Sequence, residues 1–195
     1  MKIAILKYNA GNIRSVAFAL ERLNVNFQIT DNAEEIQSAD KVIFPGVGEA
    51  SSTMEYLKEK KLDQLITNLK QPVLGICLGM QLMCKHSEEN DTPCLGIFDE
   101  VVKKFTPSNG QKVPHMGWNT LEQTTDWLTS QMSGQFVYFV HSYYVPVNPL
   151  TSAITEYINP FSAAMKKNNF YAVQFHPEKS SNTGKLILEN FIKNA

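Results

Sequence analysis

Residues 73–81 read Val73-Leu74-Gly75-Ile76-Cys77-Leu78-Gly79-Met80-Gln81, an apolar strand followed by a tight turn and the start of a helix. The apolar run before Cys77 is typical of a buried strand, and good helix formers follow from Met80 onward. The flanking glycines allow a sharp strand-to-helix turn that exposes the central side chain. Unpaired amides at a helix N-terminus stabilise the thiolate form of a cysteine, which is the attacking form. The pattern therefore predicts that Cys77 is a nucleophile.

A second polar group, His176-Pro177-Glu178, follows the apolar stretch Ala172-Val173-Gln174-Phe175 near the other end of the chain. Pro177 disfavours helical backbone at His176, so we expect extended chain in which His176 and Glu178 face the same way. A carboxylate in that position orients a histidine and stabilises its charged form. We therefore predict a catalytic triad of Cys77, His176 and Glu178.

The first half of the chain alternates predicted strands with predicted helices. One helix is expected to begin after Asn12, a cap candidate, with apolar residues at helical spacing. Asp31 and Glu34 have the spacing of a capping box for a short helix, and a longer helix is predicted over Tyr56–Leu69. The predicted strands are Ile3–Leu6, Phe27–Thr30, Lys41–Phe44 and Val73–Ile76. This βαβα order predicts a parallel sheet covered by helices on both faces.

The second half of the chain contains more strands and fewer helices. We expect some of these strands to extend the sheet in antiparallel fashion, and a helix over Thr183–Lys193 to close the chain. The predicted strands are Val101–Phe105, Gly117–Leu121, Phe136–Val140, Ser152–Tyr157 and Tyr171–Phe175. The pattern predicts a single-domain α/β fold over residues 1–195. We expect a flavodoxin-like open parallel sheet flanked by helices, with additional antiparallel strands in the C-terminal half.

Two segments are expected to meet at one edge of this sheet, because ligands of open parallel sheets bind at the carboxyl ends of strands. Pro45-Gly46-Val47-Gly48, here called the glycine loop, follows one predicted strand, and Cys77 follows another. A thiolate that attacks a carbonyl carbon creates an oxyanion, which backbone amides stabilise. The predicted donors of this oxyanion hole are the N–H groups of Val47 and Leu78.

The composition indicates an ordinary globular protein. Of the 195 residues, 43% are hydrophobic, and the formal net charge of −1 comes without the basic stripe expected of a nucleic-acid-binding protein. No apolar run has the length of a membrane span, and the start of the chain resembles a strand more than a signal peptide. Three cysteines without paired spacing favour a reducing, cytoplasmic compartment. A metal is not expected, because Cys77, His176 and Glu178 lack compact ligand spacing. No cofactor is expected either.

Three segments together resemble the class-I glutamine amidotransferases, in which a cysteine, a histidine and a glutamate release ammonia from glutamine. They are Pro45–Gly48, Gly75–Gln81 and Gln174–Ser180. The resemblance implies that glutamine is the substrate and that Cys77 forms a thioester with it. The residues implied in glutamine binding are Gly46, Gly48, Gln81, Ser142 and Tyr143.

Three further segments look like the glutaminase subunits of imidazole glycerol phosphate synthases, which act in histidine biosynthesis: Gly11–Val16, Pro114–Asn119 and Tyr138–Tyr144. This resemblance implies a heterodimer with a separate (β/α)₈-barrel cyclase subunit, which receives the ammonia internally. Partner binding is expected to activate the glutaminase by reorienting the glycine loop. The chain departs from the pattern at Lys7, where an acidic residue is common. The residues expected on the partner-facing surface are His115, Met116, Trp118, Asn119 and Tyr138.

Two other interpretations stay open. Glutaminases that serve vitamin B6 or anthranilate synthesis share the triad, although the segment Pro114–Asn119 argues against them. A non-catalytic cysteine sensor on a flavodoxin-like fold needs a reactive thiol, but it has no use for an accompanying histidine and carboxylate. Release of ammonia from glutamine separates the sensor from the enzymes.

Some reactive side chains are not assigned to the site. Cys84 and Cys94 are predicted to be inert, buried thiols. His86 lies in a polar stretch and is expected to be solvated. Two roles stay open for His115 and His141: capping a strand or filling an interface.

Overall fold

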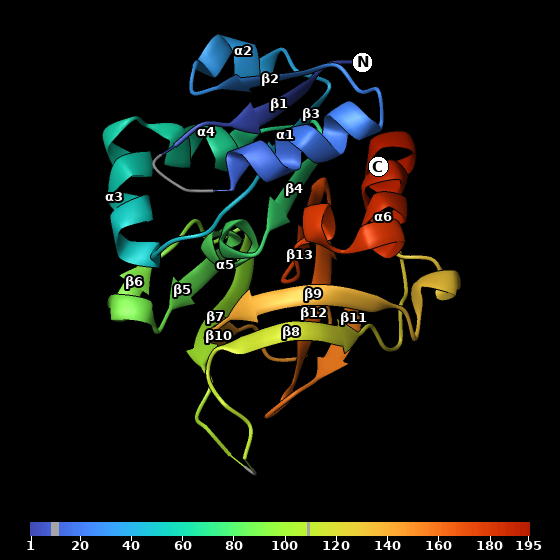
Figure 1. Cartoon of the computed structure of the whole chain (residues 1–195). Coiled ribbons are helices and arrows are strands. Elements are labelled where there is room, and N and C mark those ends of the chain that lie inside the picture. The colour runs from blue at the N-terminus through green and yellow to red at the C-terminus, as the bar shows by residue number, and fades with distance from the viewer. Residues whose placement is uncertain (9–11, 109) are drawn as a thin grey trace.

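A seven-stranded sheet forms the centre of the molecule in a computed structural model that describes residues 1–8, 12–108 and 110–195 (Figure 1). The strand order is β11-β12-β13-β4-β3-β1-β2. Strands from β13 to β2 in this order run parallel, and β11 and β12 continue the sheet in antiparallel fashion. The parallel strands are β1 (Ile3–Leu6), β2 (Phe27–Thr30), β3 (Lys41–Phe44), β4 (Val73–Ile76) and β13 (Phe170–Val173).

The interior parallel strands are buried along their whole length. Every residue of β1, β3, β4 and β13 is buried, as expected for strands that are covered on both faces. The strand β2 lies at the sheet edge and is only partly buried. The predicted bounds of the first four strands are confirmed.

Helices cover both faces of the sheet (Figure 1). On one face, Leu20 and Phe191 share a core with Ile5 of β1. On the other face, Leu57 shares a second core with Leu6 of the same strand, since successive strand residues point to opposite faces. The helices of the first face are α1 (Ile13–Arg22) and α6 (Ser181–Asn194). Those of the second face are α2 (Ala33–Gln37), α3 (Ala50–Glu59), α4 (Leu62–Asn68) and α5 (Leu78–Met83). The predicted helix-covered parallel sheet is confirmed.

The C-terminal half extends the main sheet, as predicted. Strand β12 (Pro160–Lys167) pairs antiparallel with both β11 (Thr151–Glu156) and β13. The sequence analysis did not predict β12, because its centre is Ser162-Ala163-Ala164 rather than a run of β-branched residues.

The remaining strands form two smaller sheets outside the main one. The first has the order β10-β7-β5-β6, and the second is the antiparallel pair β8–β9. Their strands are β5 (Cys84–Ser87), β6 (Thr92–Pro93), β7 (Phe98–Lys104), β8 (His115–Thr120), β9 (Phe136–His141) and β10 (Tyr143–Tyr144). The three predicted strands that correspond to β7, β8 and β9 therefore do not join the main sheet.

The predicted helix over Tyr56–Leu69 is wrong in its bounds. Helix α3 already begins at Ala50, because the Glu49 side chain accepts hydrogen bonds from two backbone N–H groups of the first turn. The chain then breaks at Lys61, which has a left-handed φ of 56°, before α4 begins.

One predicted helix cap is wrong, and a second is right in position but lacks the side-chain bond. The residue that caps α2 is Asn32, not Asp31, and its side chain accepts from the N–H groups of Glu34 and Glu35. Asn12 does precede α1, but its side chain makes no capping bond. In the ranges that the structure describes, no helix has both the length and the apolar character needed to cross a membrane.

Candidate active site

Cys77 lies in the sharp turn between β4 and α5. Its backbone has a φ of 51° and a ψ of −105°, an unusual conformation for a residue with a side chain. Two backbone bonds hold the turn: Cys77 N–H donates to Val173 O at 2.8 Å, and Gln81 N–H donates to Cys77 O at 3.2 Å. A Cβ atom on Gly79 would lie 2.0 Å from the Phe44 carbonyl oxygen, so only glycine allows α5 to pack this close to β3.

His176 and Glu178 follow β13 and form a buried pair. The Nδ1 atom of His176 lies 2.7 Å from Oε1 of Glu178, and both side chains are 0% exposed. The backbone of His176 is extended, as Pro177 requires, but Pro177–Lys179 forms a 3₁₀ turn. The expected extended chain through Glu178 is therefore wrong, although the predicted contact between the two side chains is present.

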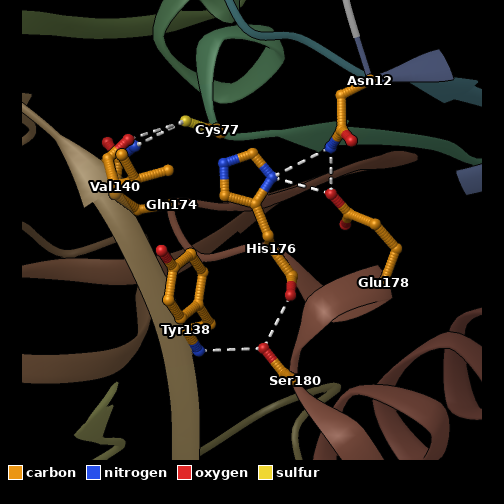
Figure 2. A network of polar contacts seen from close by, with 8 residues as sticks. All are labelled: Asn12, Cys77, Tyr138, Val140, Gln174, His176, Glu178 and Ser180. Atoms are coloured by element: carbon orange, nitrogen blue, oxygen red, sulfur yellow. Dashed lines mark hydrogen bonds and ion pairs between the residues drawn. The ribbon is translucent and has the colours of Figure 1, made fainter. Parts of the chain in front are cut away.

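The second ring nitrogen of His176 is available for chemistry. Nε2 is buried and has no hydrogen-bond partner among the described residues. In Figure 2 the imidazole lies between Cys77 and Glu178. Burial lowers the pKa of His176, but the Cys77 thiolate and Glu178 outweigh it and raise the pKa to about 10. The arrangement therefore supports a protonated imidazole of His176 beside the sulfur of Cys77.

Asn12 completes the polar network around the histidine (Figure 2). Its Nδ2 atom donates to Oε1 of Glu178 and lies 3.4 Å from Nδ1 of His176. Ser180 supports the same turn, since its Oγ donates to the His176 carbonyl at 2.6 Å and accepts from Tyr138 N–H at 2.9 Å. The sequence analysis missed Asn12 in this role. The segment around it carries a resemblance to known glutaminase subunits, but Gly11 lies outside the described residues.

A cavity of about 320 Å³ opens beside Cys77. It brings together most residues of the predicted oxyanion and glutamine sites, although Gly46 is buried and does not line it. The sequence analysis did not predict the carboxylate of Glu89 in the wall. The predicted residues in the lining are Val47, Gly48, Cys77, Leu78, Gln81, Ser142 and Tyr143.

Two buried glutamines link the carbonyl of Tyr143, in the cavity wall, to the sulfur of Cys77. Nε2 of Gln81 donates to the carbonyl of Tyr143 and to Oε1 of Gln174, each at 3.0 Å. Nε2 of Gln174 in turn donates to Sγ of Cys77 at 3.6 Å. Gln174 stands in a segment that the sequence analysis singled out, but no role was predicted for it.

The glycine loop is hydrogen-bonded to the turn that carries Cys77. The N–H of Leu78, a predicted oxyanion donor, donates to the Gly46 carbonyl at 3.3 Å, so this donor is occupied in the observed conformation. The loop is also held by Tyr8, whose hydroxyl donates to the Pro45 carbonyl. Burial raises the pKa of Tyr8, with a smaller contribution from Cys77, so this hydroxyl stays a donor.

The expected partner-facing residues divide into exposed and buried ones. Met116 is 63% exposed and Trp118 is 53% exposed, and the Trp118 ring packs edge-on against Tyr138. Asn119 and Tyr138 are partly buried. His115 is only 3% exposed, so the prediction that its side chain lies on this surface is wrong: alternation along β8 turns it inward.

Some reactive side chains outside the site differ from the predictions made for them. The three cysteines are free, with Cys84 buried and Cys94 partly buried. His86 is not simply solvated, because its Nε2 lies 2.9 Å from an Asp91 carboxylate oxygen. Within the described part of the chain, no three His, Cys, Asp or Glu side chains lie close enough together to hold a metal ion.

Relatives match this chain over nearly its whole length. A family model described as glutamine amidotransferase class-I matches residues 5–195. The chain is 62% identical over 194 residues to imidazole glycerol phosphate synthase subunit HisH of Bacteroides thetaiotaomicron, which covers 98% of this chain and 99% of that protein. It is 45% identical over 193 residues to the protein of the same name from Idiomarina loihiensis, covering 99% and 98%.

Solved structures show the same fold. A protein of Thermoplasma acidophilum described as a putative GMP synthase subunit matches with a TM-score of 0.74 at 21% identity, covering 98% of this chain and 92% of that one. A crystal structure described as a glutamine amidotransferase also matches with a TM-score of 0.74, at 17% identity, covering 97% and 98%. At such identities the likeness concerns the fold alone.

Proposed function

The chain belongs to the class-I glutamine amidotransferase family, and from this premise we propose that it is the glutaminase subunit of an imidazole glycerol phosphate synthase. The observation that carries the proposal is the buried pair of His176 and Glu178, in which Nδ1 of the histidine lies 2.7 Å from Oε1 of the glutamate. The other ring nitrogen of His176, Nε2, has no partner among the described residues and lies on the side of Cys77. Cys77 is the nucleophile, His176 the acid and base, and Glu178 the group that orients His176.

The first half of the reaction releases ammonia. The Cys77 thiolate attacks the side-chain amide carbon of glutamine, and the carbonyl π electrons move onto the oxygen. When the tetrahedral intermediate collapses, the C–N bond breaks and Nε2–H of His176 gives its proton to the leaving nitrogen. The products are free ammonia and a γ-glutamyl thioester on Cys77. Glu178 stabilises the imidazolium that precedes the proton transfer.

The second half regenerates the enzyme. Neutral His176 takes a proton from water through Nε2, and the oxygen attacks the thioester carbon. Collapse breaks the C–S bond, which restores the Cys77 thiolate beside the His176 imidazolium and releases the γ-carboxylic acid, whose proton passes to solvent to give glutamate. Glutamine and water are thus converted into glutamate and ammonia, without a cofactor.

The 320 Å³ cavity is the proposed glutamine site. Gln81 and the backbone of Ser142 and Tyr143 line it and offer hydrogen-bonding groups to the amino-acid end of the substrate. Glu89 adds a partly buried carboxylate whose pKa is raised mainly by burial. One of its oxygens already accepts from Ala50 N–H at 2.8 Å. We propose that its other oxygen receives the α-ammonium group of glutamine.

The oxyanion hole requires a change in the glycine loop. In the observed conformation the Gly46 carbonyl occupies the Leu78 N–H. Rotation of the Gly46–Val47 peptide would free that donor and turn the Val47 N–H toward the cavity. Gly48 has a φ of 141°, which glycine adopts without strain, so the loop has a residue that can absorb such a rotation.

The proposed partner is a (β/α)₈-barrel cyclase subunit that consumes the ammonia. We propose that it covers the exposed face around Met116 and Trp118 and favours the rotated glycine loop. Glutamine would then be hydrolysed mainly when an acceptor of ammonia is present. We also propose a cytoplasmic location, in keeping with three cysteines that are all free thiols.

The test is glutamate release from glutamine by the purified chain alone and in the presence of a cyclase partner with its nucleotide ligand. We expect strong release only in the complex, loss of release in Cys77→Ala, and retention in the control Cys94→Ala. Equal release with and without the cyclase would refute partner gating but keep the glutaminase. No release under any condition would refute the proposed function.

A further inference from the structure

Two buried histidines form a hydrogen-bonded pair at the cavity wall, where His141 is one of the lining residues. His115 and His141 face each other across the β8–β9 ladder and are 3% and 5% exposed. Nδ1 of His115 lies 3.0 Å from Nε2 of His141. The remaining nitrogen of His141, Nδ1, lies 2.7 Å from the carbonyl oxygen of Tyr143, a residue of the cavity wall.

These hydrogen bonds form a series that runs from Asn119 through the two histidines to the Tyr143 carbonyl, and the groups at its two ends fix the direction of each bond. The Tyr143 carbonyl can only accept, so Nδ1 of His141 carries the proton and its Nε2 accepts from Nδ1–H of His115. At the other end, Nδ2 of Asn119 donates to Nε2 of His115 at 3.4 Å and to the Glu156 carbonyl at 2.9 Å. Both rings are thus neutral Nδ1–H tautomers with both nitrogens used.

The surroundings favour this neutral state and hold the rings in place. Burial lowers the pKa of His115 to about 4. Burial also lowers the pKa of His141 to about 3, although the hydrogen bond to the Tyr143 carbonyl raises it in part. The His115 ring stacks on Tyr157 at 4.0 Å and on Phe139 at 4.8 Å between ring centres. The stacking therefore holds the His115 ring in place within this series of hydrogen bonds.

The Tyr143 carbonyl connects the histidine pair to the proposed substrate site. It accepts from His141 and also from Nε2 of Gln81, at 3.0 Å. Gln81 continues through Gln174 to Sγ of Cys77. Loss of the His141 bond would leave Gln81 as the remaining side chain, among the described residues, that donates to this carbonyl.

We propose that His115 and His141 are positioning residues for glutamine: the pair holds the Tyr143 carbonyl, and with it the Ser142 backbone and the Gln81 side chain, in the arrangement that binds the substrate. The proposal rests on the proposed glutaminase function. Because the pair belongs to the wall of the substrate cavity and does not act on the reacting atoms, its loss should raise KM for glutamine more than it lowers kcat.

Three variants, each tested in the complex with the cyclase, separate positioning from plain structural support. His141→Leu removes both hydrogen bonds, and we expect KM to rise about tenfold, the effect of one buried polar group left unpaired, with kcat within about threefold. His141→Asn places an amide N–H near the position of Nδ1, and its KM should stay at least about threefold below that of the leucine variant. His115→Phe keeps the stacking and should raise KM less than His141→Leu.

A second measurement does not depend on activity or on the folding of the leucine variant. Nitrogen-15 NMR of histidine-labelled protein at neutral pH should show His115 and His141 as neutral Nδ1–H tautomers. This signature is diagnostic, because free neutral histidine does not adopt that tautomer predominantly. Thermal unfolding of each variant shows whether a kinetic change comes from loss of fold.

The outcomes separate the inference from the function on which it rests. A KM effect that is larger in His141→Leu than in His141→Asn, together with the Nδ1–H tautomers, supports positioning. Equal kinetic losses in both folded variants, a fall in kcat with unchanged KM, or an Nε2–H tautomer at His141 would overturn it. Absence of glutamate release by the unmodified chain would instead refute the proposed function, and this inference with it.

Discussion

Asn12 donates a hydrogen bond to Oε1 of Glu178, the same oxygen that lies 2.7 Å from Nδ1 of His176. The carboxylate oxygen therefore accepts from two side chains that belong to opposite ends of the chain. The shared acceptor fixes the orientation of the carboxylate, which in turn fixes the tautomer of the histidine.

Loss of the Asn12 amide should slow catalysis without weakening substrate binding. In Asn12→Ala we expect kcat to fall about tenfold at nearly unchanged KM, because the carboxylate loses one charge-assisted hydrogen bond. Asn12→Asp should be worse, since it places a second carboxylate against Glu178. Steady-state glutamate release in the cyclase complex is the measurement, with the exposed Asn26→Ala as the matched control. Normal kcat in Asn12→Asp would contradict this role.

The contact of Asn12 with Glu178 shows where sequence analysis ends. Asparagine before a helix predicts a cap, which is a local tendency. The observed bond joins residues 166 positions apart and depends on how α1 packs near the turn after β13. By contrast, strands such as Ile3–Leu6 are encoded locally in continuous apolar runs, and their bounds were predictable.

The turn at Pro177 was half predictable for a related reason. A proline restricts the residue before it, and His176 is indeed extended, with a φ of −100° and a ψ of 95°. The same proline also suits the first position of a helical turn, and the chain follows that preference into the 3₁₀ turn at Glu178. Which preference wins depends on tertiary contacts such as the Ser180 bond to the His176 carbonyl.

The charge on His176 should depend on Cys77. Its pKa of about 10 lies above the ordinary 6.5, so the proton stabilises the folded chain fully below about pH 6.5 and this contribution is lost as pH rises through about 10. Cys77→Ala removes the largest cause that raises the pKa and leaves burial, which lowers it. We expect an NMR titration of His176 in this variant to move to lower pH. An unchanged His176 titration would contradict the coupling between Cys77 and His176.

The close approach of α5 to β3 should make Gly79 intolerant of any side chain. A Cβ atom there would meet the Phe44 carbonyl at 2.0 Å. We expect Gly79→Ala to lower the free energy of unfolding by about 3 kcal/mol or more, because backbone rather than a side chain must move. Gly96→Ala is the comparison: its φ is 70° but no atom lies within 4 Å, so about 1–2 kcal/mol is expected. Urea unfolding of both variants measures the difference, and equal losses would contradict the steric argument.

Glu89 should contribute to substrate binding through charge. In Glu89→Gln we expect KM for glutamine to rise about tenfold or more, because a charge-assisted hydrogen bond to the α-ammonium group is lost. Kinetics in the cyclase complex test this, with the exposed Glu55→Gln as control. A substrate analogue without the α-amino group sharpens the test, since its KM should not respond to the variant. An equal rise in KM for both substrates would mean that Glu89 acts on the shape of the cavity instead.

The exposed aromatic surface beside the site should determine how tightly the cyclase binds. Trp118 is 53% exposed on β8, and its ring packs edge-on against Tyr138, whose own ring lies 6.0 Å from Nζ of Lys179. A large, partly supported aromatic of this kind is the usual anchor of an interface, and its truncation commonly costs about 2 kcal/mol or more, which is about thirtyfold in Kd.

We therefore expect Trp118→Ala to weaken cyclase binding about thirtyfold or more while leaving the melting temperature of the free chain nearly unchanged. Calorimetric titration with the cyclase measures Kd, and Ile29→Ala on the edge strand β2, 39% exposed, is the matched apolar control. Because the cyclase is proposed to act through the glycine loop, saturating cyclase should restore glutamate release in the tryptophan variant. Weak release even at saturation would mean that Trp118 also transmits the activation, and unchanged Kd would move the interface away from β8.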